Sequence, residues 1–260
     1  MARPIDVGSQ PEIAAASRTP TIEEQRGCWE WHWQNWRGRK AINEWVLERG
    51  ERVLQILDSL ALARPNILDL GCGMGWFCNE LSRFGSVTGV DISEEAIAKA
   101  KATYPSITFV AGNALTHPLP AARFDVVVSQ EVLAHVDDQA KFVEVAAAAL
   151  RPGGYFIVTT ANKFVTDRLA PGWDPWPAEH IERFVDRRGL RRLLSRHFRV
   201  LRTTSMIFVG DSGILRLVNS YTLNKMLSRL IPERYWGDWK GRVGLGYTLI
   251  AVAQKKDASP

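Results

Sequence analysis

The sequence predicts an α/β fold in which helices cover both faces of a parallel sheet. Short runs of apolar residues alternate with helix-like segments between residues 64 and 160, and strands buried on both faces are apolar throughout. A glycine-rich turn, GCGMG, follows the first run, and an aspartate ends the second. With 260 residues, the chain can form one large domain of this kind with appended helices.

A helical cap over residues 21–63 is expected before the first strand. Residues 1–20 contain three prolines and little apolar periodicity, so we expect a flexible segment there. Residues 21–49 and 51–63 each have a helical pattern. Three tryptophans repeat at i, i+4 and i+7 in the first helix, a stripe that suits core packing or a cover over a pocket: Trp29, Trp33 and Trp36.

The central segments alternate regularly between strands and helices. Helices are expected after Gly75, over 93–104 and over 138–150. Ser93 is a favourable N-cap because its hydroxyl can accept a backbone N–H at the start of the helix. The expected strands are residues 66–70, 86–91, 106–112, 124–129 and 155–160.

The alternation weakens after residue 160. Residues 161–178 are rich in Pro and Trp and indicate a lid-like loop, and 179–196 have the pattern of a basic amphipathic helix. FRVLRTTSMIFV predicts another strand, and GYTLIAVAQK predicts the closing one. The α/β domain is therefore expected over residues 64–254, with 255–260 as a tail.

The composition predicts a globular protein of the cytoplasm. Apolar residues make up 46% and charged residues 23% of the chain, which is ordinary for such proteins. The formal charge of +5 is modest and the basic residues are spread along the sequence, so no nucleic-acid partner is expected. The three cysteines form no CxxC pair, no apolar run reaches about 18 residues, and the first residues lack a basic-then-apolar signal.

A nucleotide site is predicted where the first strand ends. Gly71, Gly73 and Gly75 lie where a strand must turn sharply into a helix and a cofactor can lie against bare backbone. A dinucleotide motif requires GxGxxG, but Trp76 occupies the position of its third glycine, which disfavours a nicotinamide oxidoreductase. Asp91 ends the next strand, where an acid can hold both ribose hydroxyls.

Five segments together resemble the class I S-adenosylmethionine-dependent methyltransferases: ILDLGCGMG, VTGVDIS, VAGNAL, FDVVVSQEVLAHV and LRPGGYFIVTT. They occur in the family's order and spacing over roughly residues 60–160, and agreement is weaker over 179–254. The arrangement is most similar to the ubiquinone-biosynthesis O-methyltransferase type and its small-molecule relatives. The resemblance implies a Rossmann-like seven-stranded sheet of order 3-2-1-4-5-7-6, with the last strand antiparallel.

The resemblance also implies S-adenosylmethionine as the cofactor. Asp69 would lie beneath the cofactor's amino group, at the family's acidic position. The turn that follows would line the methionine and ribose portions, through Gly71, Cys72, Gly73 and Gly75.

The same resemblance implies contacts with the nucleoside and with the amino acid end. Asp91 would hold the ribose diol, and Ile92 would cover the adenine. Asn113 and Ala114 would meet the adenine edge, where an asparagine can both donate and accept hydrogen bonds. Gln130 would approach the amino acid end through its backbone.

In the similar enzymes, an arginine from the N-terminal cap meets the cofactor's carboxylate. Here Arg37, within Trp36-Arg37-Gly38-Arg39, is the candidate. An arginine binds a carboxylate through two hydrogen bonds, a contact that lysine does not readily replace. Solvated positions for Arg37 and Arg39 are the alternative.

Candidate catalytic residues follow the fourth strand, in SQEVLAHVDD. If that segment is helical, Glu131 and His135 share one face, about one turn apart. Methyl transfer from a sulfonium needs mainly alignment and a deprotonated acceptor, and a neutral histidine is the natural base for a hydroxyl. His135 and His180 are therefore candidate bases, with Glu131 beside them. A structural role for both histidines is the alternative.

The same segment bears on metal binding. Some similar enzymes carry a Glu-x-x-Glu-His run here, and a later histidine completes a divalent metal site. Glu131, His135 and His180 match that pattern, but Ala134 replaces the second glutamate. These three groups with water remain able to hold Mn, Fe or Zn, but the loss of a carboxylate disfavours a hard ion such as Mg²⁺, so no metal ligand is assigned.

The acceptor is expected to be a small molecule, methylated on a hydroxyl oxygen by in-line displacement. Residues 210–244 are the part least similar to the family, so acceptor determinants are expected there. The expected helix over 213–231 carries only cationic charges. It either packs on the domain or forms a wall for a hydrophobic or lipid-linked acceptor, in peripheral contact with an anionic membrane surface.

Two other functions remain open from the sequence. The chain could be a non-catalytic S-adenosylmethionine-binding scaffold, an alternative that Ala134 supports, or it could methylate nitrogen or carbon. The sequence does not define the oligomeric state.

Overall fold

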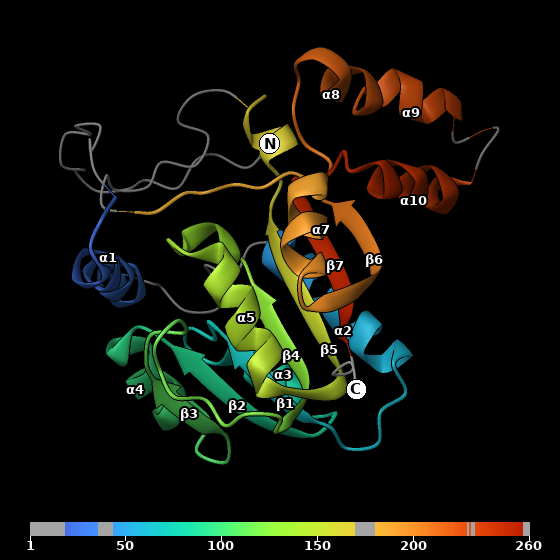
Figure 1. The fold of residues 1–260 in the computed structure, drawn as a ribbon. Coiled ribbons are helices and arrows are strands. Elements are labelled where there is room, and N and C mark those ends of the chain that lie inside the picture. Colours follow the sequence, from blue (N-terminus) through green and yellow to red (C-terminus); the bar gives the residue numbers. More distant parts are fainter. Residues whose placement is uncertain (1–18, 36–43, 170–179, 228, 230–231, 257–260) are drawn as a thin grey trace.

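The computed structural model describes residues 19–35, 44–169, 180–227, 229 and 232–256. Its centre is a seven-stranded sheet of order β3-β2-β1-β4-β5-β7-β6 (Figure 1), which confirms the predicted fold class. The strands are β1 Asn66–Leu70, β2 Ser86–Asp91, β3 Thr108–Ala111, β4 Phe124–Gln130, β5 Leu150–Ala161, β6 Phe198–Met206 and β7 Thr248–Lys255.

The direction of the strands determines where a ligand can bind. β3, β2, β1, β4 and β5 pair in parallel, whereas β7 runs antiparallel to both β5 and β6. The chain order reverses between β1 and β4, so the loops that follow these two strands diverge at one edge of the sheet. In open α/β sheets, ligands bind in the crevice at such a switch point.

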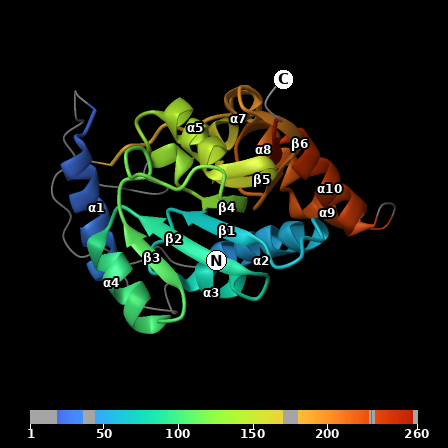
Figure 2. The same cartoon turned by 60° about the horizontal axis from the view of Figure 1, so that its bottom comes forward.

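Helices cover both faces of the sheet, as the buried apolar strands require (Figure 2). On one face α5 and α7 supply Phe142, Val143, Leu190 and Leu194 to the core. On the other face α2, α3 and α4 supply residues such as Val53. The helices are α1 Ile22–Asn35, α2 Glu44–Ser59, α3 Trp76–Leu81, α4 Glu94–Thr103, α5 Gln139–Ala149, α6 Lys163–Thr166, α7 Arg187–Ser195, α8 Gly213–Val218, α9 Tyr221–Leu227 and α10 Glu233–Val243.

The helices of the cap differ from the expectation. The predicted break at Gly50 is wrong, because α2 runs through this position. A Cβ at Gly50 would lie 2.9 Å from Cη2 of Trp76 and 3.3 Å from Cε2 of Phe77, so glycine allows α2 to pack closely on α3. The predicted flexible segment lies outside the described residues, apart from Thr19 and Pro20.

The predicted helix over 179–196 is also wrong in its first half. α7 begins at Arg187, where Asp186 caps the helix by accepting the N–H of Gly189. Residues 180–186 form no helix, because the backbone of Ile181 bonds to other elements. Its N–H donates to Oε1 of Gln25, 3.1 Å away, and its carbonyl contacts Nδ1 of His135 at 2.9 Å.

The predicted single helix over 213–231 is two helices, α8 and α9. Asn219 separates them and donates from Nδ2 to the carbonyl of Gly210. α10 was not predicted, and it packs on β6 where a Cβ at Gly241 would lie 2.7 Å from the carbonyl oxygen of Ser205. α6 lies near the start of the predicted lid-like loop, and residues 170–179 of that loop lie outside the described part.

Residues 210–244, where acceptor determinants were expected, pack on the domain through a small apolar core that includes α8. Leu215 and Val218 of α8 are buried against Val165 of α6 and against Leu245, just before β7. Among the described residues, every helix is too short or too polar to cross a membrane.

Candidate active site

The glycine-rich turn joins β1 to α3 at the switch point. Gly71 and Gly75 have φ of 88° and 77°, a region that side chains rarely adopt. A Cβ at Gly71 would collide with the side chain of Val132, and one at Gly75 would lie 2.6 Å from the ring of Phe109. The turn therefore requires glycine both for its backbone conformation and for its close packing.

Asp91 lies beside this turn at the end of β2. Its Oδ2 accepts the N–H of Gly73 at 2.8 Å and its Oδ1 accepts the N–H of Ser93 at 3.0 Å. Burial raises the pKa of the Asp91 carboxyl, and these two N–H groups oppose the rise. A carboxylate offers about four lone-pair sites, so both oxygens keep the capacity to accept further hydroxyls.

Asp69 lies beneath the turn and is almost fully buried. Burial raises its pKa to about 7, although the Cys78 thiol donates to Oδ2 at 3.2 Å and lowers it in part. Cys72 is also buried, and its thiol donates to the carbonyl of Gly73. Two buried acids, Asp69 and Asp91, therefore give this end of the sheet a preference for a cationic ligand.

The residues predicted at the adenine edge lie at the same end of the sheet as the glycine turn. Ile92 is half-buried directly after Asp91. Asn113 and Ala114 follow β3 and are also half-buried, and Oδ1 of Asn113 accepts the N–H of Leu115 at 2.9 Å. The parallel pairing of β2 with β3 brings these two loops to the same edge.

At the end of β4 the chain turns sharply at Glu131. The φ of Glu131 is 57°, a value that residues other than glycine rarely adopt. Such a conformation indicates that the surrounding structure holds the backbone in place here. The condition under which Glu131 and His135 would share a helical face is therefore not met, since only Leu133–His135 form a short 3₁₀ turn. The Thr159 hydroxyl donates to Oε1 of Glu131 at 2.9 Å.

An arginine of the cap reaches this turn, but it is Arg49 of α2. Its Nε donates to Oε1 of Gln130 at 3.2 Å, and its Nη1 lies 3.8 Å from Oε1 of Glu131. Burial raises the pKa of Glu131, and Arg49 opposes the rise. Arg37 lies outside the described residues. Helical spacing could have identified Arg49, which lies four residues before the buried Val53.

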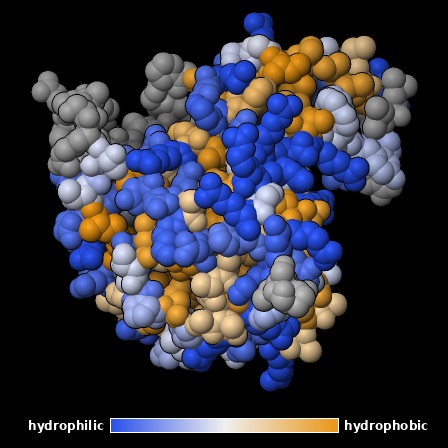
Figure 3. All heavy atoms as spheres, viewed as in Figure 1, coloured by the Kyte–Doolittle hydropathy of each residue, from blue (hydrophilic) through white to orange (hydrophobic). Residues whose placement is uncertain are grey.

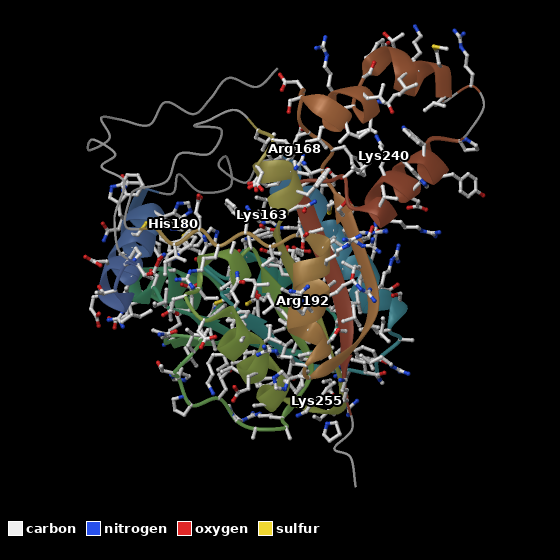
Figure 4. The ribbon with its side chains drawn as sticks, turned by 45° about the horizontal axis from the view of Figure 1, so that its top comes forward. Lys163, Arg168, His180, Arg192, Lys240 and Lys255 are labelled. Atoms are coloured by element: carbon white, nitrogen blue, oxygen red, sulfur yellow. The ribbon has the colours of Figure 1, made fainter. Side chains whose placement is uncertain are left out.

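The two candidate histidines are brought together although 45 positions separate them in the sequence. Their ring centroids are 4.3 Å apart, and His180 lies beside α1 (Figure 4). Nδ1 of His135 lies 2.9 Å from the carbonyl of Ile181. A carbonyl only accepts, so the proton of neutral His135 resides on Nδ1 and the basic lone pair on Nε2.

Burial keeps the imidazoles in this cluster neutral. It lowers the pKa of His135 to about 4, although the hydrogen bond to Ile181 opposes the shift. The pKa of His180 is lowered to about 2, mainly by burial and to a smaller extent by the neighbouring imidazoles. His32 of α1 also joins the cluster, and burial together with the neighbouring His135 lowers its pKa to about 4.

Helix α1 covers the glycine turn and the two histidines. The Trp29 ring lies 5.5 Å from His135 and 5.2 Å from His180, centroid to centroid. Trp33 lies over the glycine turn, since a Cβ at Gly73 would be 2.6 Å from its Cζ2. Trp29 and Trp33 therefore pack against the domain and also cover the glycine turn and the histidines. Trp36 lies outside the described residues.

Glu30 holds α1 against the start of α4, a role that the sequence did not indicate. Its carboxylate accepts the N–H groups of Glu94 at 2.8 Å and Glu95 at 3.2 Å, and the hydroxyl of Ser93 at 2.9 Å. These are first-turn groups of α4, where unpaired N–H groups and the helix dipole attract an anion. No local pattern signals this role, because Glu30 and α4 are distant in sequence.

Removing the Glu30 carboxylate should loosen the cover. Glu30→Ala leaves the N–H groups of Glu94 and Glu95 without this acceptor, a change of ~1 kcal/mol or about fivefold in the ratio of closed to open cover. We expect S-adenosylmethionine to associate and dissociate severalfold faster, measured by stopped-flow tryptophan fluorescence. Glu23→Ala, an exposed acid on the same helix, is the control and should leave the rates unchanged. Equal rates in wild type and Glu30→Ala would contradict the covering role.

Within the part of the chain that the structure describes, no three His, Cys, Asp or Glu side chains gather as a metal-binding group. Ala134, in the position of the second glutamate, is fully buried.

Comparison with known proteins agrees with this geometry. Residues 68–158 match the model of a methyltransferase domain family. The chain is 34% identical over 185 residues to a ubiquinone biosynthesis O-methyltransferase of Methylobacterium sp., covering 66% of this chain and 74% of that protein. It is 38% identical over 133 residues to a probable S-adenosylmethionine-dependent methyltransferase of Mycolicibacterium smegmatis, covering 51% of this chain and 50% of that one. The chain thus spans about half the length of several such relatives.

Solved structures share the fold at low identity. The N-methyltransferase NodS of Bradyrhizobium japonicum, in complex with S-adenosyl-L-homocysteine, has a TM-score of 0.62 at 18% identity and covers 89% of this chain and 98% of its own. The [4+2]-cyclase SpnF has a TM-score of 0.55, also at 18% identity, and covers 80% of this chain and 81% of its own. The sheet order, the glycine turn with Asp91 and the sequence relatives together show that the chain belongs to the class I S-adenosylmethionine-dependent methyltransferases.

Proposed function

We propose that this protein transfers the methyl group of S-adenosylmethionine to a hydroxyl oxygen of a small molecule. The observation that carries the proposal is neutral His135, whose Nδ1 contact with Ile181 leaves the lone pair on Nε2 at the end of β4. The O-methyltransferase name of the Methylobacterium relative supports the choice of oxygen.

In this proposal the cofactor lies against the glycine turn, between β1 and the covering helix. Asp91 holds the ribose diol and Ile92 covers the adenine, whose edge meets Asn113 and Ala114. Asp69 stabilises the amino group from beneath the turn. Both acids have pKa values raised by burial, and a cationic sulfonium and ammonium would favour their charged forms.

The carboxylate of the cofactor would lie near Arg49, with the backbone of Gln130 at the amino acid end. Arg49 already reaches Gln130 and Glu131, and its side chain is only 15% exposed. A partly buried guanidinium binds a carboxylate more strongly than a fully solvated one. In this arrangement Glu131 positions Arg49 and does not itself transfer a proton.

The chemical step follows from these positions. The hydroxyl oxygen attacks the methyl carbon as the carbon–sulfur bond breaks, His135 takes the hydroxyl proton on Nε2, and S-adenosylhomocysteine leaves. A base with a pKa of about 4 is weak, so an acidic hydroxyl suits it better than an alcohol. A phenol, with a pKa near 10, is therefore the proposed acceptor class. Trp29 and His180, whose ring centroids lie 5.2 Å apart, would contact the acceptor beside His135.

An acceptor panel tests this proposal. Release of S-adenosylhomocysteine is measured with a phenol, the matching aniline, the matching O-methyl ether and an aliphatic alcohol, each with and without a chelator. We expect release with the phenol alone, unaffected by the chelator. Release with the aniline only would indicate N-methylation. Tight cofactor binding without release for any acceptor would indicate a scaffold.

A further inference from the structure

One face of helix α1 contacts the segment that carries His180 and Ile181. Sγ of Cys28 lies 3.7 Å from Nδ1 of His180, and the ring of Trp29 packs against the same imidazole. Gln25 lies about one turn earlier on this face and reaches the next residue of the segment. Its Oε1 accepts the N–H of Ile181 at 3.1 Å. Gln25 therefore lies in the interface between the covering helix and the histidine pair.

Gln25 is buried although its side chain is polar. Hydrophilic residues cover much of the protein surface, as Figure 3 shows for one face, whereas Gln25 is only 3% exposed. Its Nε2 has no hydrogen-bond partner in the part of the chain that the structure describes. Burying an amide group that lacks part of its hydrogen bonds costs free energy, so packing alone would favour an apolar side chain here. The contact that requires glutamine is therefore the one from Oε1 to Ile181.

Ile181 connects this contact to His135. Its N–H donates to Gln25, and its carbonyl lies 2.9 Å from Nδ1 of His135. Two residues later, the N–H of Arg183 donates to the carbonyl of Ala134 at 2.7 Å. The backbone of Ile181 is thus held on both sides, and Gln25 opposes a rotation that would turn the carbonyl away from the imidazole.

We infer that Gln25 is a positioning residue that sets the tautomer of His135 through Ile181. The hydrogen bond made by one ring nitrogen decides which nitrogen of a neutral imidazole carries the proton. Without a carbonyl held at Nδ1, the proton of His135 can also lie on Nε2, and that form has no lone pair on Nε2 to accept a proton. The effect on the rate rests on the proposed function, because it requires His135 to be the base.

Gln25→Met tests the role of the Oε1 contact. Methionine has a similar length and volume but cannot accept the N–H of Ile181. Nitrogen-15 NMR of histidine-labelled protein at neutral pH distinguishes a protonated ring nitrogen from a bare one, and the spectrum of His135→Gln assigns the signals of His135. With saturating S-adenosylhomocysteine, His135 should carry its proton on Nδ1 in the wild type and should populate both tautomers in Gln25→Met.

The same variant should lower kcat on a phenolic acceptor roughly fivefold, the equivalent of one neutral hydrogen bond. The KM for S-adenosylmethionine should change little, because Gln25 bonds to the segment beside His135 and not to the glycine turn.

Two controls separate this role from a general structural one. Gln139→Met removes a second glutamine near His135, whose Nε2 donates to the carbonyls of Leu133 and Arg183 at 2.8 and 2.7 Å. It should lower the melting temperature and keep the wild-type tautomer. Glu30→Ala loosens α1 but retains Gln25, so with saturating S-adenosylhomocysteine it should also keep the proton on Nδ1.

A wild-type tautomer in Gln25→Met, or the same change of tautomer in either control, would overturn the inference. A change of tautomer without a fall in kcat would confirm that Gln25 sets the tautomer and would instead exclude His135 as the base. The NMR measurement needs no methyl transfer, so its result does not depend on the acceptor proposed above.

Discussion

Replacing Asp91 with alanine should lower the affinity for S-adenosylmethionine at least 100-fold. Each hydrogen bond to a charged group contributes about 1.5–3 kcal/mol, and a ribose diol would make two with this carboxylate. The substitution also releases the N–H groups of Gly73 and Ser93, which Asp91 now accepts. The glycine turn would therefore lose both a contact with the ligand and a hydrogen bond that holds its backbone. Calorimetric titration with S-adenosylmethionine and S-adenosylhomocysteine measures the effect.

Asp125→Asn is the matched control for this experiment. Asp125 and Asp91 are equally exposed, at 9%, but Asp125 lies at the opposite end of the sheet. There it accepts the N–H of Asn66 at 2.6 Å and pairs with Arg151 at 2.7 Å. Its replacement should lower the melting temperature and leave cofactor affinity intact. Affinity for S-adenosylmethionine within threefold of wild type in Asp91→Ala would refute the assigned site.

Replacing His135 with glutamine should reduce kcat about 10²- to 10⁴-fold on a phenolic acceptor, the range for loss of a general base. Glutamine keeps a polar group of similar size near Ile181 but cannot take the proton. The KM for the cofactor should change little, because His135 acts on the acceptor. His197→Gln, beyond α7 and away from the site, is the control and should retain full activity.

The pH profile separates a base from a structural histidine. The base works when deprotonated, and burial lowers the pKa of His135 to about 4. Wild-type kcat should therefore be flat near neutral pH and fall as pH drops through about 4, in the range where the protein stays folded. In His135→Gln that fall should vanish, and kcat should instead rise with pH toward the pKa of the phenol as solvent supplies the phenolate. A variant with unchanged kcat would assign the base to another group.

The strands and the cofactor turn were predictable because their signals are local. The short, mostly apolar stretch 66–70 is bounded by Pro65 and Gly71, which favours a buried strand, and β1 has these bounds. Gly71 and Gly75 must adopt positive φ, so the sequence itself marks the turn. Asp91 follows at the end of the next strand, and parallel pairing of β1 with β2 necessarily brings it to that turn.

Other features depended on contacts between distant segments. The sequence could not reveal that α2 runs through Gly50, because the reason is the approach of Trp76 and Phe77 from α3. It predicted helix from residue 179, but contacts with Gln25 and His135 hold the stretch around Ile181 extended. In that segment, tertiary hydrogen bonds outweigh the local helix propensity.

The sequence alone therefore determined the fold class, the position of the cofactor turn and the candidate histidines. Only the tertiary structure decided how these parts are used. It brought His135 against His180, placed Arg49 near Glu131 and bonded Glu30 of α1 to the first turn of α4. The physical reason is that motif spacing records local backbone geometry, whereas pairing, burial and charge clustering arise only when segments far apart in the chain pack together.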